Sequence, residues 1–325
     1  MREYDESDVR VRSGKGSRPR TKNRPTHSDA REAMVVTVDR GRWGCALDGD
    51  PDHIVTAMRA RELGRTPIVV GDSVGIVGDL SGRPDTLDRI VRRDERRSVL
   101  RRTADDTDPT ERVVVANADQ LLMVVALADP PPRGGLVQRA LIAAYVGGLR
   151  PILCLTKNDL APAEPFAAEF ADLDLTVLTA GRDDPLDAVA PLLTGKVTVL
   201  LGHSGVGKST LVNRLVPQAD RATGEVSGVG KGKHTSTQSV ALALDDGWVI
   251  DTPGIRSFGL AHIRPDDVLL AFSDLAAAIG DCPRGCGHMG PPADPECALD
   301  ALTGPAEARV AAARRLIAVL NEPAY

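Results

Sequence analysis

The sequence predicts three domains in a row: a small β-barrel, a doubly wound α/β domain, and a short helical domain that carries metal-ligand residue types. Three observations favour this arrangement. Five short strand-like runs fall within residues 33–104, apolar strands alternate with helical patterns over residues 105–260, and three cysteines cluster with a histidine in residues 261–325. Apolar strands that alternate with helices are typical of a parallel sheet covered on both faces. A chain of 325 residues is long enough to give each domain its own core.

We expect residues 1–32 to form a disordered basic tail. They lack apolar periodicity, and the stretch from Arg10 to Arg24 holds seven Lys or Arg residues and no acid. The whole chain has a net charge of −5, so it is not a simple polycation. The bunched positive charge suits either a polyphosphate partner or a solvated tail.

Composition also predicts a cytoplasmic protein without a membrane segment. The longest apolar stretch, residues 121–128, is far shorter than a membrane span, and the first residues lack the apolar core of a targeting signal. Five cysteines are too few and too unevenly placed for a secreted disulfide framework. We therefore expect a reducing cytosol and, because no helical face is conspicuously apolar, a monomer.

The first domain is expected to be a five-stranded barrel of the OB-fold type. Turn-forming residues separate its short apolar runs, which is typical of strands joined by tight turns. Five such runs within about 60 residues fit an OB-fold, although an SH3-like barrel would give similar punctuation. The predicted strands are residues 34–39, 42–47, 53–60, 74–77 and 87–91.

A group of arginines near the end of this domain favours RNA binding. Only Asp94 and Glu95 interrupt it, and each phosphate that a basic residue neutralises releases condensed counterions. Aromatic residues make up 3% of the chain, so we expect contact with the RNA backbone rather than stacking on bases. The group comprises Arg89, Arg92, Arg93, Arg96, Arg97, Arg101 and Arg102.

The second domain alternates buried strands with helices. Its predicted strands are residues 113–115, 121–128, 152–155, 175–178, 197–201 and 248–250. Its predicted helices are residues 135–147, 165–173 and 185–193. Such a pattern predicts a parallel sheet covered on both faces, as in doubly wound nucleotide-binding domains.

The most specific motif follows the apolar run at residues 197–201. Glycines let backbone N–H groups turn inward around phosphate oxygens, and the following helix adds the positive end of its dipole. Lys208 can reach the β- and γ-phosphates, and Ser209 can ligate Mg²⁺. The phosphate loop comprises Gly202, His203, Ser204, Gly205, Val206, Gly207, Lys208, Ser209 and Thr210.

A second loop of the site follows the strand at residues 248–250. Asp251 stands where an aspartate holds the Mg²⁺ shell in P-loop proteins, and the N–H of Gly254 can sense the γ-phosphate. The sequence therefore predicts a nucleoside triphosphate site that uses Mg²⁺.

A third loop predicts that the base is guanine. The Asp159 carboxylate can accept both N1–H and the exocyclic amine of guanine, a donor pair that adenine lacks. The stem of Lys157 can lie along the base plane, and Thr179 or Ala180 after the next strand can offer a backbone N–H to the guanine carbonyl. The tetrapeptide is Thr156, Lys157, Asn158 and Asp159.

The order of these motifs is unusual, because the base-reading tetrapeptide precedes the phosphate loop. In this respect the chain resembles the circularly permuted GTPases, in which surface loops are cut and rejoined while the strands pair unchanged. Five motifs together resemble the bacterial ribosome small subunit-dependent GTPases over residues 34–320. They are Asn117-Ala118-Asp119-Gln120, the loops at 156–159 and 202–210, residues 232–237, and residues 251–258.

This resemblance implies an N-terminal OB-fold, a permuted P-loop GTPase domain and a C-terminal zinc domain. Members of the family act late in assembly of the small ribosomal subunit, contact its 16S rRNA, and hydrolyse GTP faster when bound to the 30S particle. The implied cofactors are GTP, Mg²⁺ and one structural Zn²⁺. We expect the same partners here, with release of an assembly factor as the outcome.

The resemblance also implies roles for residues 232–237 as switch I. Thr235 or Thr237 should close over Mg²⁺ and the γ-phosphate, and the sequence does not choose between them. Ile255 stands where Ras-like proteins place a water-orienting glutamine, so His234 is the candidate that orients water instead. Gly205 replaces the asparagine of potassium-dependent GTPases, so no potassium ligand is inferred.

The third domain contains a Cys₃His set suited to tetrahedral Zn²⁺. Four ligands within sixteen positions leave no vacancy for water, which indicates a structural site. Three residues separate the first two cysteines and eight separate the histidine from the last cysteine, where the family more often has four and five. The proposed ligands are Cys282, Cys286, His288 and Cys297, and the longer spacing puts only Cys297 in question. A final helix is predicted at residues 305–320.

Two other functions are compatible with these motifs. One is a small-molecule kinase that shares only the phosphate loop, and the other is a non-enzymatic RNA-binding module that holds a nucleotide. A kinase has no need of a guanine-reading carboxylate such as Asp159. Nucleotide turnover with and without small ribosomal subunits separates the three possibilities.

Overall fold

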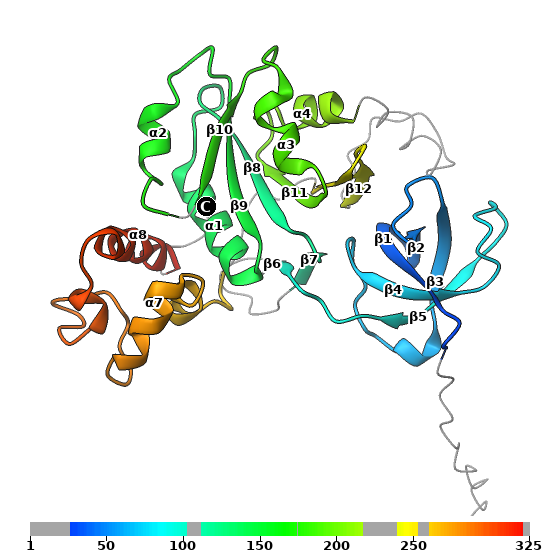
Figure 1. Cartoon of the computed structure of the whole chain (residues 1–325), viewed down its shortest axis with the longest axis horizontal. Helices are drawn as coiled ribbons and strands as arrows, with labels where there is room; N and C mark the ends of the chain where they lie inside the picture. Colours follow the sequence, from blue (N-terminus) through cyan, green and yellow to red (C-terminus); the bar gives the residue numbers. More distant parts are fainter. Residues whose placement is uncertain (1–26, 103–111, 174, 217–238, 253–259, 321–325) are drawn as a thin grey trace, which may run out of the picture.

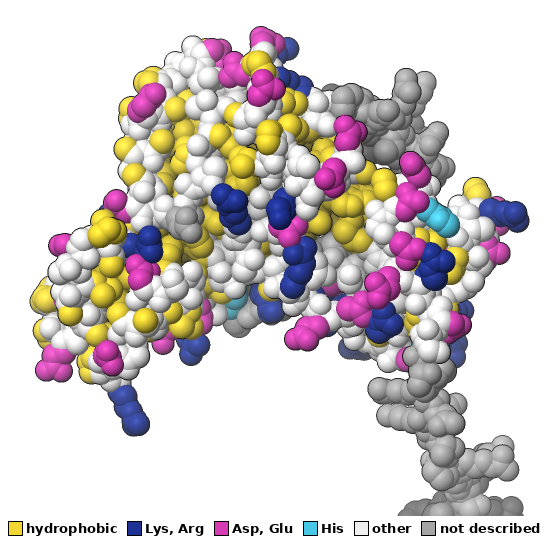
Figure 2. Space-filling view, viewed as in Figure 1, with side chains coloured by type: hydrophobic (Ala, Val, Ile, Leu, Met, Phe, Trp, Pro, Cys, Tyr) yellow, Lys and Arg dark blue, Asp and Glu magenta, His cyan; other side chains and the backbone are white. Residues whose placement is uncertain are grey.

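The structure is a computed structural model that describes residues 27–102, 112–173, 175–216, 239–252 and 260–320. Within them a barrel, a central α/β domain and a helical C-terminal domain follow one another along the chain (Figure 1). Acidic and basic side chains are interspersed over the barrel in the view of Figure 2. None of the described helices is long and apolar enough to span a membrane.

The barrel consists of five strands that close on themselves. Their order is β1-β2-β3-β5-β4, and β4 also pairs with β1. Only the β3–β5 pair is parallel, as expected for an OB-fold Greek key. The strands are β1 (Arg31–Asp39), β2 (Arg42–Leu47), β3 (Ile54–Arg59), β4 (Ser73–Val77) and β5 (Asp88–Arg93), with a 3-10 turn, η2 (Arg61–Leu63), after β3. The predicted barrel is therefore confirmed, and Val35, Val55 and Ile76 lie in its core.

The central sheet has the order β10-β9-β8-β11-β13-β12. All neighbours are parallel except β12, which runs antiparallel to β13. The strands are β8 (Gln120–Ala126), β9 (Arg150–Thr156), β10 (Thr176–Ala180), β11 (Lys196–Gly202), β12 (Val240–Ala243) and β13 (Gly247–Asp251). Strands that precede β11 in sequence lie on one side of it and strands that follow lie on the other, so a topological switch point falls between β8 and β11.

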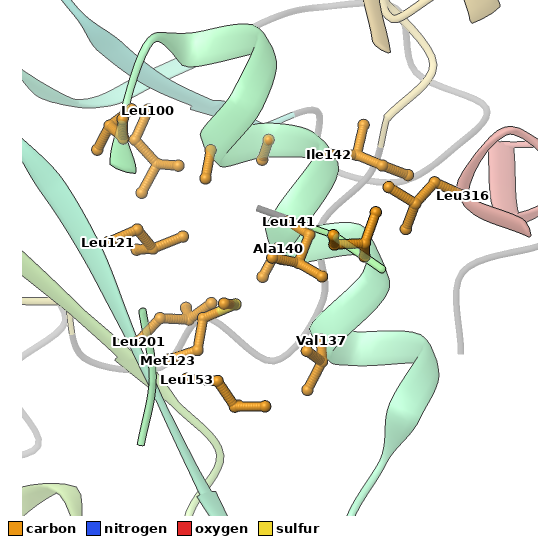
Figure 3. Packing of buried hydrophobic residues seen from close by; sticks show 14 of the residues in the cluster. Leu100, Leu121, Met123, Val137, Ala140, Leu141, Ile142, Leu153, Leu201 and Leu316 are labelled. Carbon is orange, nitrogen blue, oxygen red and sulfur yellow. The ribbon is translucent and has the colours of Figure 1, made fainter. Parts of the chain in front are cut away.

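Alternate residues of β8 serve two cores, one on each face of the sheet. Leu121 and Met123 face α1 (Gly134–Gly147), whereas Leu122 and Val124 pack against α4 (Lys208–Leu215) on the other face (Figures 1 and 3). This is the covered parallel sheet that the sequence predicts. The remaining helical elements are α2 (Glu164–Ala168), η3 (Leu186–Ala188) and α3 (Ala190–Leu193).

Two strands, β6 (Val99–Arg102) and β7 (Arg112–Ala116), form a separate antiparallel pair between the barrel and the central sheet. Leu100 of β6 belongs to the apolar core that α1 covers (Figure 3). The sequence predicted β7 but neither β6 nor β12.

The C-terminal domain packs on α1 through its last helix. Leu316 of α8 (Pro305–Leu320) lies beside Ile142 of α1 (Figure 3), and the predicted helix at residues 305–320 is confirmed. Ahead of it lie α6 (Pro265–Leu269), α7 (Ser273–Ala278), η4 (Ile279–Asp281) and η5 (Ala298–Ala301).

Candidate nucleotide site and metal centre

The phosphate loop joins β11, which ends at Gly202, to α4, which begins at Lys208. Gly205 and Gly207 have φ values of +81° and +92°, a region that side chains with a Cβ rarely adopt. A Cβ at Gly202 would lie 2.7 Å from the carbonyl oxygen of Val124 in β8. The glycines therefore permit a tight turn that passes close to the neighbouring strand.

The remaining loop residues line this turn or open the helix. Val206 is buried, Ser204, Ser209 and Thr210 are exposed, and the N–H of Ser204 donates to Nδ1 of His203 over 3.1 Å. Exposed hydroxyls in the first turn of a helix are available to an ion or a phosphate.

Asp251 lies beside the phosphate loop because β13 pairs with β11. Its carboxylate accepts a charge-assisted hydrogen bond from Nζ of Lys208, with the two side chains 30% and 12% exposed. The neighbouring hydroxyl of Thr252 donates to the carbonyl of Leu200 over 2.6 Å and holds the end of β13 against β11. One cation and one carboxylate thus converge where a triphosphate and its metal ion would lie.

The base-reading tetrapeptide meets the phosphate loop directly. The hydroxyl of Thr156, at the end of β9, donates to the carbonyl of Val206 over 2.6 Å. Lys157 has a φ of +57°, and its ammonium donates to the carbonyl of Asp129 in the loop after β8. Asp159 is exposed in the turn that follows β9. The two loops that are distant in sequence therefore border one site.

The loop after β10 lies at the same edge of the sheet. Ala180 pairs with Thr156 in the parallel ladder, which places Thr179 and Ala180 beside the tetrapeptide. Asn158 Nδ2 donates to the Asp184 carboxylate over 3.3 Å.

Sequence reasoning missed two residues that hold this loop in place. The Asp184 carboxylate accepts the N–H of Gly181 over 2.7 Å. Arg214 of α4 donates to the carbonyls of Gly181, over 3.1 Å, and of Asp184. The Gly181-to-Asp184 spacing followed by Pro185 is a recognisable turn pattern, but nothing in the sequence points to Arg214.

The predicted switch residues His234, Thr235, Thr237 and Gly254 lie outside the described residues.

The predicted metal ligands do converge. One potential ligand atom from each of Cys282, Cys286, His288 and Cys297 lies within 4.8 Å of the others. Cys282 Sγ is 3.5 Å from Nδ1 of His288. Zinc–sulfur bonds of about 2.3 Å place the ligand atoms of a tetrahedron roughly 3.5 to 4 Å apart, so the four side chains fit this ion. Residues 291–293 are exposed, and the longer spacer loops out while still bringing Cys297 to the cluster.

Side chains around the cluster fix its geometry. The ring Nε2 of His288 lies 3.0 Å from the Asp266 carboxylate, which leaves Nδ1 facing the sulfurs. Arg314 of α8 donates to the carbonyl of His288 over 2.8 Å and approaches Sγ of Cys297 at 3.6 Å. The Asp294 carboxylate accepts the N–H groups of Gly287 and Met289, each over 2.9 Å. Carboxylate–histidine pairs of this kind orient imidazole ligands at metal sites.

Comparison with known proteins gives consistent matches. A sequence profile of the RsgA GTPase family matches residues 93–261. The small ribosomal subunit biogenesis GTPase RsgA of Burkholderia mallei (strain SAVP1) is 38% identical over 240 residues, which are 70% of this chain and 73% of that protein. The protein of the same name from Chlorobaculum parvum is 34% identical over 281 residues, 82% of this chain and 89% of the relative.

Two solved structures share the fold. YjeQ from Thermotoga maritima superposes with a TM-score of 0.61 at 21% identity and covers 89% of this chain and 98% of its own. YloQ, described as a circularly permuted GTPase, gives a TM-score of 0.62 at 22% identity and covers 91% of this chain and 96% of its own. These likenesses support the permuted strand order seen here.

Proposed function

Because this chain belongs to the RsgA GTPase family, we propose that it binds the small ribosomal subunit and hydrolyses GTP late in the maturation of that subunit, with release of an assembly factor. The observation that carries the proposal is the bond between Thr156 and the carbonyl of Val206. It joins a loop suited to guanine to a loop suited to a triphosphate, despite their reversed order in the chain.

Guanine recognition is assigned to the tetrapeptide and the loop after β10. Asp159 accepts the N1–H and the amine of the base, and a backbone N–H at Thr179 or Ala180 donates to its carbonyl. Asn158 and Lys157 position the loop through Asp184 and the carbonyl of Asp129. Adenine cannot satisfy the same acceptor, so ATP should be rejected.

Phosphate binding and hydrolysis are assigned to the loop before α4. The backbone N–H groups of residues 203–209 surround the phosphates, Lys208 leaves Asp251 to contact them, and Ser209 and Asp251 hold Mg²⁺. Held there, Mg²⁺ would neutralise charge on the phosphate oxygens. His234 orients the attacking water, Gly254 senses the γ-phosphate, and Thr235 or Thr237 completes the metal shell.

We assign a structural zinc ion to the Cys₃His cluster. Such an ion supplies folding energy to the domain, because its ligands come together only in the folded state. Cys282, Cys286, His288 and Cys297 hold it, and Asp266 and Arg314 support the first and last elements of the domain around it.

The partner is the 30S subunit with its 16S rRNA, contacted through the barrel and those of its arginines that are exposed, such as Arg89, whereas Arg96 is paired with Asp72 inside the protein. Unstimulated turnover should be slow until the particle orders the switch segments. GTP and ATP turnover measured with and without purified small subunits tests the proposal. GTP-specific hydrolysis that the particle accelerates supports it, and equal use of ATP, or no hydrolysis in either condition, contradicts it.

A further inference from the structure

Within the part of the chain that the structure describes, the side chains of the motif Asn117-Ala118-Asp119-Gln120 form hydrogen bonds away from the phosphate loop, the guanine tetrapeptide and the metal cluster. The motif lies between β7 and β8, where the central domain meets the barrel. We propose that Asn117 is a positioning residue whose hydrogen bonds hold the barrel against β11, the strand that leads into the phosphate loop. We call this contact, which Gly71, Asn117, Arg97 and Asp119 form, the clasp. Through it, RNA bound to the barrel holds the GTPase centre in a fixed place on the particle. This inference rests on the proposed function.

The barrel side of the clasp is the segment from Pro67 to Asp72. Val70 forms a parallel bridge with Val115 of β7, and its carbonyl accepts the N–H of Ala116 over 3.0 Å. Gly71 has a φ of +88°, and a Cβ there would lie 2.0 Å from the carbonyl oxygen of Ala116. The two backbones therefore approach more closely than any other residue at position 71 would permit.

Asn117 uses both ends of its amide at this contact. Nδ2 donates to the carbonyl of Gly71 over 2.9 Å, and Oδ1 accepts the N–H of Arg97 over 3.0 Å. Its own φ is +56°, a left-handed conformation that asparagine tolerates better than most residues. The donor, the acceptor and the backbone conformation are together satisfied by asparagine at this position.

A second set of bonds fixes the connecting segment on the barrel. The guanidinium of Arg96 donates to both carboxylate oxygens of Asp72, over 2.6 and 2.8 Å, and to the carbonyl of Pro67 over 3.0 Å. The Asp72 side chain is fully buried, and that of Arg96 is 10% exposed. A bidentate pair with this burial holds a defined geometry.

Asp119 continues the contacts to the phosphate-loop strand. One carboxylate oxygen accepts a hydrogen bond from the guanidinium of Arg97 over 2.5 Å, and the other accepts one from the backbone N–H of Val197 over 2.7 Å. Val197 lies at the start of β11, which ends at Gly202. Hydrogen bonds therefore link the barrel loop at Gly71 to β11 through Asn117, Arg97 and Asp119.

The consequence for the reaction is geometric. Among the described residues, the barrel also meets the central domain through the β1–β12 pair Thr37 and Val240, and its buried Val36 belongs to the apolar cluster of the central domain. A loosened clasp would let the GTPase domain adopt many orientations while the barrel stays on the RNA. A smaller fraction of the bound complexes would then present the switch segments to the particle. The stimulation of GTP turnover by the particle would fall in proportion to that fraction.

Two variants test the clasp. Asn117→Gly keeps the left-handed backbone and removes both amide bonds, and Gly71→Ala drives the two segments apart from the barrel side. Asp48→Gly, at a barrel residue with a φ of +51°, is the matched control for glycine at such a position, and its side chain forms an exposed ion pair with Arg31 away from Asn117. Spin labels at the exposed positions 40 and 187, introduced as unnatural amino acids, report the distance between the barrel and the central domain.

Both variants should broaden the distance distribution and leave GTP affinity and unstimulated turnover within about twofold, while stimulated turnover falls by about tenfold. The Asp48→Gly protein should behave as wild type. Narrow distances in both variants, or equal loss of stimulated and unstimulated turnover, would overturn the clasp. If the small subunit does not stimulate the wild-type protein, the proposed function is overturned instead. The distance distributions between the two spin labels would then test the clasp without reference to turnover.

Discussion

The hydroxyl of Thr156 donates a 2.6 Å hydrogen bond to the backbone carbonyl of Val206. Both residues are buried, with 7% and 4% of their surfaces exposed. The bond joins the end of β9 to the turn before α4, so the loop assigned to the base and the loop assigned to the phosphates share one support. A change at Thr156, in the loop assigned to the base, should therefore also affect binding of the phosphates.

Replacement of Thr156 by valine should weaken GTP and GDP binding about fivefold each, because loss of one buried hydrogen bond costs about 1 kcal/mol. Valine matches threonine in shape and leaves the Val206 carbonyl without this donor. Titration with a fluorescent guanine nucleotide measures the effect. The control is Thr176→Val, at the start of β10 and therefore at the end of the strand away from the site, and it should bind both nucleotides as wild type does. Equal affinities for wild type and Thr156→Val would show that the bond does not shape the phosphate loop.

Replacement of Asp159 by asparagine should change which base is bound. The asparagine amide offers a donor where guanine also presents donors, so GTP affinity should fall about a hundredfold. Xanthosine triphosphate carries a carbonyl in place of the exocyclic amine and should then bind better than GTP. Competition between the two nucleotides measures the ratio. The control Asp183→Asn removes a nearby exposed carboxylate and should keep the preference for GTP. If Asp159→Asn also keeps the preference for GTP, another residue reads the base.

Acid should weaken the central domain partly through Asp119. Burial alone would raise the pKa of this carboxyl, but hydrogen bonds from Arg97 and the Val197 N–H, with the charges of Arg97 and Lys196, outweigh burial and lower the pKa. A group whose pKa is lower in the folded state stabilises that state above its unfolded pKa of about 3.9 and loses this contribution as the pH falls further.

Asp119→Asn should therefore lower the free energy of unfolding by about 1 to 2 kcal/mol at pH 7, and by progressively less as the pH falls below about 4 toward the lowered pKa of the folded state. Trp43→Phe as a background leaves Trp248 of β13 as the remaining tryptophan and the reporter of urea unfolding. Asp39→Asn, at an exposed carboxylate, should change neither the stability nor its pH dependence. If the difference in free energy of unfolding between wild type and Asp119→Asn stays constant down to pH 3, ionised Asp119 is not the source of the stabilisation.

His234→Ala should lower stimulated GTP turnover at least about a hundredfold and leave GTP affinity unchanged, because general-base or water-orienting groups contribute about 10²- to 10⁴-fold to rate. Single-turnover hydrolysis with saturating small subunits measures the step. Lys231→Ala, in the same segment, is the control for a change that removes a side chain there. Full stimulated activity in the His234→Ala protein would assign the water to another residue.

Local pattern was sufficient to predict the barrel strands and the last helix. Short apolar runs separated by turn residues predicted β1 to β5. The shared apolar face of Val310, Ala313, Leu316 and Ile317 predicted α8, and these four side chains are buried in the fold. Such signals depend on neighbours in sequence and are read without knowledge of tertiary contacts.

Elements that depend on tertiary contacts were missed or misjudged. β6 is four residues with two arginines, and it forms a strand because β7 pairs with it and α1 covers Leu100. The single helix predicted at residues 185–193 is wrong, because η3 and α3 are separate and Pro191, which lacks an N–H, lies in the first turn of α3. The helix predicted at 165–173 ends at Ala168, and bonds of the 3-10 type continue it as turns.

The meeting of the two nucleotide loops was predictable because carboxyl ends of parallel strands share one edge of a sheet. The bond from Asn117 to Gly71, which spans 46 residues and joins two domains, was not. No spacing rule connects a barrel turn to the strand of another domain, so the motif was visible in sequence while its partner was not.

Asp266 should set the affinity of the cluster for zinc. Its carboxylate lies 3.0 Å from Nε2 of His288, and this contact holds Nδ1 toward the sulfurs. Asp266→Asn should lower zinc affinity about 10- to 100-fold, the usual effect of losing a carboxylate behind a histidine ligand. Competition with a chromophoric chelator measures the affinity without reference to GTP turnover.

Asp281→Asn removes a similar charge next to Cys282 without a contact to His288, and it should bind zinc as tightly as wild type. Because a bound zinc ion would stabilise the C-terminal domain, chelator should expose α8 to protease at a lower concentration in Asp266→Asn than in Asp281→Asn, while nucleotide binding at the phosphate loop persists in both. Equal zinc affinities in the two variants would mean that packing around His288, and not the Asp266 carboxylate, orients the ring.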